Sequence, residues 1–127
     1  MGTELAQSSY SWKTLMGKGV TVSNGSDCPV ELPNVMGGMQ CAVTRRDLKG
    51  VGPYLPREAF TVQEALDSFT KMGAKASFEE TIKGEIQPGM LADFVVLGEN
   101  PFETDPSKLN GIPILATYLG GKQVYGK

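Results

Sequence analysis

The stretch GVTVSNGSDCPV, from Gly19 to Val30, carries the main prediction of fold in this sequence. Its β-branched run, Val20–Ser23, is suited to a buried strand. The turn cluster Asn24–Asp27 ends that strand, so the carboxylate of Asp27 falls just past its carboxyl end. Catalytic groups occupy this position in barrel enzymes. Turn statistics alone favour a plain turn here, so the stretch by itself is a weak functional signal.

Helices are predicted on both sides of this strand. The strongest signal is Thr61–Glu64, which fits a capping box and predicts a helix over Val62–Gly73. The other elements predicted before residue 80 are helices over Ser9–Gly17, Met36–Arg46 and Lys75–Phe78, and an exposed loop rich in glycine and proline over Gly50–Arg57.

The last third of the chain has a β-strand pattern. Ala92–Leu97 is apolar on both faces and predicts a strand, after a turn at Pro88-Gly89 that Asp93 would cap or orient. Gly120-Gly121 predicts a hairpin, because both residues adopt positive φ readily. The remaining predictions are strands over Gly84–Ile86, Ile114–Leu119 and Gln123–Tyr125, and a polar loop over Asn100–Asn110.

A lone strand among helices, as predicted at Val20–Ser23, cannot be a complete α/β sheet. A buried strand needs neighbours on both edges. The pattern therefore suggests that some strands of the sheet lie outside these 127 residues.

Charge and hydropathy exclude several classes of protein. Twelve basic and fourteen acidic residues give a net charge of −2, and the basic pair Arg45-Arg46 is followed at once by Asp47. We interpret Arg45-Arg46-Asp47 as a solvated charged face. The alternative is that the arginines bind a carboxylate in a bidentate manner. We expect no nucleic-acid partner. We also expect no membrane partner, because no apolar run approaches the roughly 20 residues that span a bilayer.

The nucleophile and metal-ligand inventory is small. The two cysteines, Cys28 and Cys41, do not form a CxxC pair, and the chain has no histidine. Free thiols are favoured, while a disulfide stays open. Cys28 lies beside Asp27 but has no imidazole to activate it as a nucleophile.

Three stretches, in this order, resemble the C-terminal quarter of the amidohydrolase superfamily, in the group similar to N-substituted formamide deformylase and exoenzyme regulatory protein. They are GVTVSNGSDCPV (19–30), LPREAFTVQEALDSFTKMGAKA (55–76) and KGEIQPGMLADFVVL (83–97), and ATYLGGKQVY (116–125) looks like the usual ending of the family.

The resemblance implies an α/β fold. Residues 1–80 would form the C-terminal end of a (β/α)8 barrel, with Val20–Ser23 as its eighth strand, and residues 81–127 would form part of a β-sandwich. It also implies that Asp27 is catalytic and in many members a metal ligand, facing zinc or another divalent ion in the full-length parent. The carboxylate would take a proton from the attacking water and pass it to the departing nitrogen.

The departure from the family is the missing ligand set. Relatives supply histidines from strands that this chain lacks, and a lone aspartate does not hold zinc. We therefore expect no metal in the isolated chain and no activity from it. The parent would hydrolyse a small-molecule amide-type substrate in the cytoplasm. The alternative hypothesis is a non-catalytic binding or assembly module that self-associates through the exposed barrel face.

Overall fold

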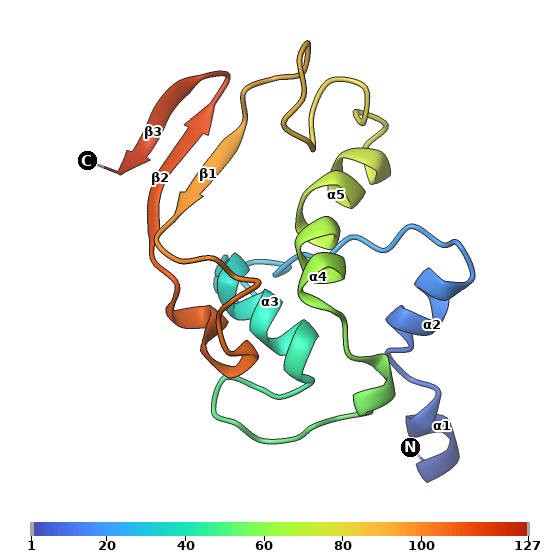
Figure 1. The fold of residues 1–127 in the computed structure, drawn as a ribbon. Coiled ribbons are helices and arrows are strands. Elements are labelled where there is room, and N and C mark those ends of the chain that lie inside the picture. Colours follow the sequence, from blue (N-terminus) through green and yellow to red (C-terminus); the bar gives the residue numbers. More distant parts are fainter. Residues whose placement is uncertain (1, 127) are drawn as a thin grey trace.

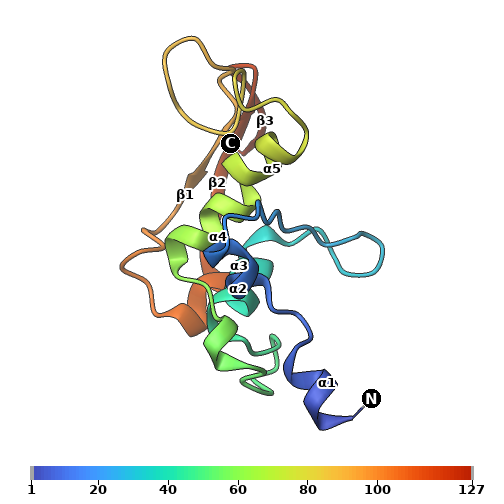
Figure 2. The ribbon, with the colours of Figure 1, turned by 90° about the vertical axis from the view of Figure 1, so that its right-hand side faces the viewer.

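The computed structural model describes residues 2–126 (Figure 1). The sheet lies at one end of the molecule and α1 at the other in both views (Figure 1 and Figure 2). The elements in chain order are α1 (Thr3–Gln7), α2 (Trp12–Gly17), α3 (Val35–Thr44), the 3-10 helix η1 (Pro56–Glu58), α4 (Val62–Phe69), α5 (Lys71–Ala76), β1 (Phe94–Leu97), the 3-10 helix η2 (Pro106–Gly111), β2 (Ile114–Leu119) and β3 (Lys122–Gly126).

The capping box at Thr61 is confirmed and starts α4. The Thr61 hydroxyl accepts the Glu64 amide over 3.1 Å, and Glu64 Oε2 accepts the Thr61 amide over 2.7 Å. The predicted continuous helix to Gly73 is wrong, because the backbone leaves the helical region at Thr70 (φ −125°, ψ −98°). The Thr70 hydroxyl bonds to the Leu66 carbonyl over 2.7 Å, an arrangement that often bends helices. The chain then restarts as α5.

The core lies where α3, α4 and η2 meet. Asn34 caps α3 by accepting the Gly37 amide over 3.0 Å, and Arg45 ends it in a left-handed conformation (φ 55°). Gly38 permits a close approach to α4, since a Cβ there would lie 2.8 Å from Phe69 Cζ. The buried apolar residues of this cluster are Met36, Met39, Phe60, Ala65, Leu109 and Ile112.

Two of those core residues come from the predicted polar loop Asn100–Asn110 and the residues just after it. The second half of that loop is η2, and Leu109 within it is fully buried. Asn110 also donates its amide to Gln40 Oε1 on α3 over 2.9 Å. The core thus joins residues from both sides of the predicted boundary between 1–80 and 81–127, and that boundary stays a prediction.

The three strands form one antiparallel sheet in the order β1-β2-β3. The hairpin turn at Gly120-Gly121 is confirmed, with φ of 57° and 78°. Phe94 of β1 stacks on Tyr118 of β2 with ring centroids 4.5 Å apart, a cross-strand pair that fixes the register.

Two predicted strands are absent from the part of the chain that the structure describes. Residues 20–23 belong to no sheet, because no strand of the described chain pairs with them, although Val22 packs against the core. Gly84–Ile86 bends instead of extending. Gly84 has φ of 104° and packs against α5, where a Cβ would lie 2.8 Å from Ala74 Cβ. The fold is therefore α/β with a small antiparallel sheet. Among residues 2–126 there is no helix with the length and apolar character needed to cross a membrane.

Candidate functional site

Asp27 lies in a turn that α4 holds in place. Its side chain is exposed and its backbone is left-handed (φ 49°). The Asp27 carbonyl accepts the Val30 amide over 2.9 Å, and the Ser26 carbonyl accepts the Glu31 amide over 3.2 Å. These two bonds close the turn and leave the carboxylate of Asp27 free to meet solvent or a ligand.

Ser68 anchors the start of this turn. It is fully buried in α4, and its carbonyl accepts the Asn24 amide over 3.0 Å. The Ser68 hydroxyl donates to the Ala65 carbonyl over 2.7 Å and so accepts from Asn24 Nδ2 over 2.9 Å. This pair of bonds fixes the Asn24 side chain with its amide nitrogen toward Ser68 and its oxygen, Oδ1, facing away.

A cavity of about 940 Å³ begins beside Asp27. One wall is Asn24–Ser26 with Glu31–Val35, and another is Asp47–Lys49. Phe69 and the first part of α3 line it as well. The cavity adjoins the turn, since Ser26 lines it and Asp27 is the next residue. A site of this size accommodates a small organic molecule.

The wall at Asp47–Lys49 is built by the charged segment Arg45-Arg46-Asp47. Arg46 donates from Nη1 to the carbonyls of Gly50 and Gly52 over 2.9 and 2.6 Å. Asp47 Oδ1 accepts the amides of Lys49 and Val51 over 2.9 and 2.8 Å. Both side chains are exposed, as expected of a solvated charged face, and they also hold their own loop in shape.

The donor set does not fit a metal. Among residues 2–126, no group of three or more Asp, Glu, Cys or His side chains is placed to hold an ion. Asp27 offers one carboxylate, and structural and catalytic zinc sites use three or four protein ligands. Cys28 and Cys41 are free thiols, and neither belongs to such a group in the described chain. Burial raises the pKa of the Cys41 thiol, and the negative charges of Asp47 and Glu31 raise it further.

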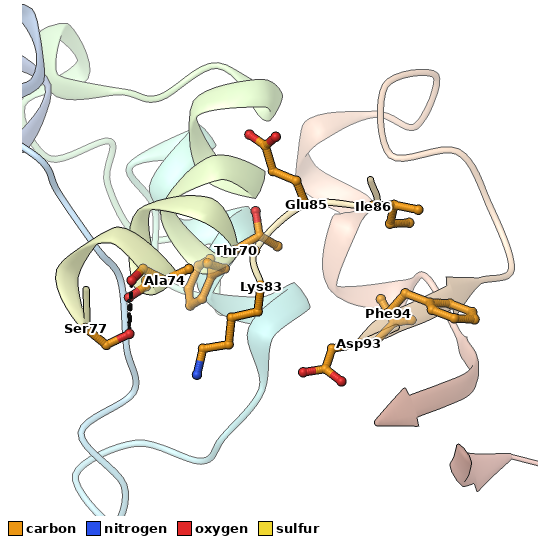
Figure 3. A pocket seen from close by; sticks show the side chains of 12 residues that line it. Thr70, Ala74, Ser77, Lys83, Glu85, Ile86, Asp93 and Phe94 are labelled. Carbon is orange, nitrogen blue, oxygen red and sulfur yellow. Dashed lines mark hydrogen bonds between the residues drawn. The ribbon is translucent and has the colours of Figure 1, made fainter. Parts of the chain in front are cut away.

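A second cavity of about 520 Å³ separates α5 from β1 (Figure 3). Lys83 and Asp93 line it, but both have structural partners. Lys83 Nζ lies 2.5 Å from Glu79 Oε2, and Asp93 Oδ1 accepts the Gly120 amide over 2.6 Å. The Asp93 carboxylate therefore orients the β2–β3 hairpin turn, whereas the sequence assigned it to the turn at Pro88-Gly89, so that assignment is wrong. This cavity is the weaker candidate because its charged groups are already paired.

Glu58 is a buried carboxylate that the sequence did not single out. Its side chain is 1% exposed, and Thr14 donates to it twice, from the hydroxyl over 2.6 Å and from the amide over 2.9 Å. These bonds hold the pKa of Glu58 below its ordinary value. Since all its partners belong to α2 and η1, Glu58 fastens these two elements together and does not belong to the site at Asp27.

Comparison with known sequences gives consistent results along the chain. The sequence model of the amidohydrolase family (Amidohydro_3) matches residues 1–125. A Bacillus subtilis (strain 168) protein named amidohydrolase YtcJ is 36% identical over all of this chain and 24% of its own length. Protein LONG AFTER FAR-RED 3 of Arabidopsis thaliana is 36% identical over 98% of this chain and 21% of its own. The N-substituted formamide deformylase of Arthrobacter pascens is 33% identical over 86% and 20%.

The fold has a counterpart among solved structures. An amidohydrolase from Thermotoga maritima MSB8 superposes with a TM-score of 0.66 at 22% identity, over 90% of this chain and 25% of that one. The chain therefore spans about a quarter of the length of the relatives it matches. Because the family model matches almost every residue, this chain belongs to the amidohydrolase family.

Proposed function

We propose that this chain is the C-terminal part of a metal-dependent amidohydrolase that hydrolyses amide-type C–N bonds, with Asp27 as its acid–base carboxylate. The observation that carries the proposal is the place of Asp27. It stands exposed in a turn that Ser68 anchors to α4, beside a cavity large enough for a small substrate, in a chain of this family. A relative named N-substituted formamide deformylase supports the choice of a C–N bond.

The chemistry assigned to Asp27 is proton transfer. The carboxylate accepts a proton as water adds to the amide carbon, and then donates it to the nitrogen as the C–N bond breaks. Exposure of the side chain suits both steps, because it must reach water first and the leaving nitrogen afterwards. Metal dependence requires ligands from outside residues 2–126, since the described side chains form no such cluster.

The proposal includes the fold of the longer protein. Val20–Ser23 would pair with barrel strands outside this chain, as their last member, and residues 81–127 would complete a β-sandwich with further strands. Residues 20–23 pair with no strand of the described chain, which supports this arrangement. Two free thiols favour a reducing compartment such as the cytoplasm.

The test compares the longer protein with this chain alone. A gene product that contains these 127 residues together with the upstream barrel would be loaded with zinc and screened against simple amides and N-formyl compounds for amine release. We expect turnover from the longer protein that a chelator abolishes, and none from the 127-residue chain. A longer protein that releases no amine from any of these compounds would contradict the proposal.

An assembly module is the second candidate, because the chain exposes far more surface than its size calls for. The accessible area is 8658 Å² for 13.6 kDa, whereas a compact monomer of that mass exposes about 6,600 Å². Several large apolar side chains lie on the sheet in solvent, among them Val95, Leu115, Leu119 and Tyr125. Surface of this kind is typical of an interface.

A further inference from the structure

We propose that the cavity beside Asp27 receives the apolar substituent of the amide substrate, and that Leu32 and Leu48 determine which substituents bind. This inference rests on the proposed function, because it assigns the substrate class of the same site. It concerns this chain's own residues, so it can be tested without metal and without turnover.

The lining of the cavity beside Asp27 is partly apolar. Leu32 and Leu48 come from two segments that lie sixteen residues apart, yet both line the same cavity. They are 81% and 50% exposed, so neither is used in the core. Val35 and Phe69 extend the apolar lining. A volume of about 940 Å³ lies within the range of small-molecule sites, which are mostly apolar with a few placed polar groups.

Two polar groups of the turn that precedes Asp27 also face no protein partner among the residues that the structure describes. The bond from Asn24 Nδ2 to Ser68 leaves Asn24 Oδ1 as an acceptor, and no donor among residues 2–126 reaches it. Likewise, the Ser26 hydroxyl has no partner in the described chain. Both residues line the cavity. An acceptor and a hydroxyl in one cavity lining complement an amide, which offers an N–H donor and a carbonyl acceptor.

The charges and the rigid wall of the cavity also favour a neutral ligand. Glu31, Asp47 and Lys49 line the cavity, so its charged groups sum to one net negative charge, with Asp27 adjacent. This balance disfavours a ligand with a carboxylate tail and favours a neutral one. The hydrogen bonds of Arg46 and Asp47 to their own loop hold the wall at Leu48 in place before any ligand arrives, and preorganisation of this kind lowers the cost of binding.

The experiment is a titration of the 127-residue chain, followed by the shifts of its backbone amide signals in two-dimensional NMR. The ligands are acetamide, butanamide and hexanamide, with hexanoate as the charged counterpart of the longest. We expect shifts at Gly37, Gly38, Leu48 and Lys49, with an affinity that rises about fourfold per added methylene. Hexanoate should bind more weakly than hexanamide. Affinities independent of chain length, or shifts confined to other residues, would overturn the inference.

Matched variants locate the effect. The double variant Leu32→Asp/Leu48→Asp should lose the gain with chain length. The control Val30→Asp/Val51→Asp, at neighbouring positions that are 78% and 53% exposed and outside the cavity lining, should keep it. Asp27→Asn should bind hexanamide like the wild type, so a failure of this binding is distinct from a failure of the proposed acid–base role. Equal loss in both double variants would remove Leu32 and Leu48 as specificity residues.

Discussion

Ser68 and Asn24 hold the start of the turn that contains Asp27. Ser68 has no contact with solvent, and its single hydroxyl proton goes to the Ala65 carbonyl. The Ser68 hydroxyl oxygen can therefore only accept a hydrogen bond from Asn24, and this bond fixes the Asn24 side chain with its amide nitrogen toward Ser68. Ser68 is thus a positioning residue for the turn, although it lies four residues beyond Glu64, the last residue of the capping box.

We predict that Ser68→Ala destabilises the chain by about 1–3 kcal/mol, because the Asn24 amide nitrogen would lose its buried partner. Hydrogen exchange at residues 24–30 should rise more than elsewhere. Ser77→Ala is the control, since the Ser77 hydroxyl also bonds to helix carbonyls but belongs to the exposed residue that follows α5. Unchanged exchange at residues 24–30 in Ser68→Ala would show that the turn holds itself.

The sequence singled out Asp27, whose role stays a prediction, and missed Ser68, which holds its turn. Asp27 stood out because a turn cluster follows a β-branched run and because that stretch resembles the amidohydrolase family. The sequence did not indicate a role for Ser68. It lies three residues after Ala65 on the apolar face of the helix, where any small residue would be expected to pack in the core. Only its burial and its bonds to Asn24 reveal its role.

At the scale of elements, α2 is fastened to the body of the protein by two carboxylates. Glu58 of η1 accepts two bonds from Thr14, and Glu64 of α4 lies 2.6 Å from Lys13 Nζ. Glu64 also belongs to the capping box of α4. Attachment of α2 therefore depends on two acidic side chains, of which the sequence pattern assigned Glu64 only to the capping box and did not single out Glu58.

We predict a stability step at low pH that Glu58→Gln removes in part. The folded pKa of Glu58 is lowered, so its contribution is present above its unfolded value near 4.5 and is lost as the pH falls through the folded pKa. Urea unfolding midpoints would be compared for both proteins from pH 7 downward. The variant should be less stable at neutral pH, and the difference between the two urea midpoints should vanish below pH 4.5. A gap of the same size at every pH would exclude this role.

Secondary structure was predictable where the determinants are local. The capping box, the two-glycine hairpin and the strand after Asp93 all follow from neighbouring residues. Val20–Ser23 pairs with no strand of the described chain. Gly84–Ile86 is not a strand because Gly84 takes a positive φ of 104° where it lies against α5. The burial of Leu109 arises from packing against α3, which no local pattern of a polar segment encodes.

At the scale of the whole molecule, the surplus of surface is the main physical feature. It amounts to roughly 2,000 Å² over a compact monomer, which exceeds the roughly 800 Å² that each partner buries in a standard interface. In the longer protein the remaining barrel and sandwich strands would cover it. An isolated chain has only other copies of itself available.

We therefore predict that the isolated chain self-associates at micromolar concentrations. Light scattering should give a mass at least twice the 13.6 kDa of one chain. Replacing apolar residues of the sheet face, as in Leu115→Lys/Leu119→Lys, should shift the equilibrium toward monomer. A clean 13.6 kDa species for the unmodified chain would leave the assembly hypothesis without support.

The proposed acid–base role of Asp27 can be tested with a single variant. Asp27→Asn in the longer, zinc-loaded protein removes the proton-transfer group while keeping the size and polarity of the side chain. We predict that kcat for amide hydrolysis falls by about 10²–10⁴-fold, with an unfolding temperature equal to that of the wild type. Glu80→Gln, a neutralised acid on the exposed surface, should keep full activity. Near-normal turnover by Asp27→Asn would contradict the account.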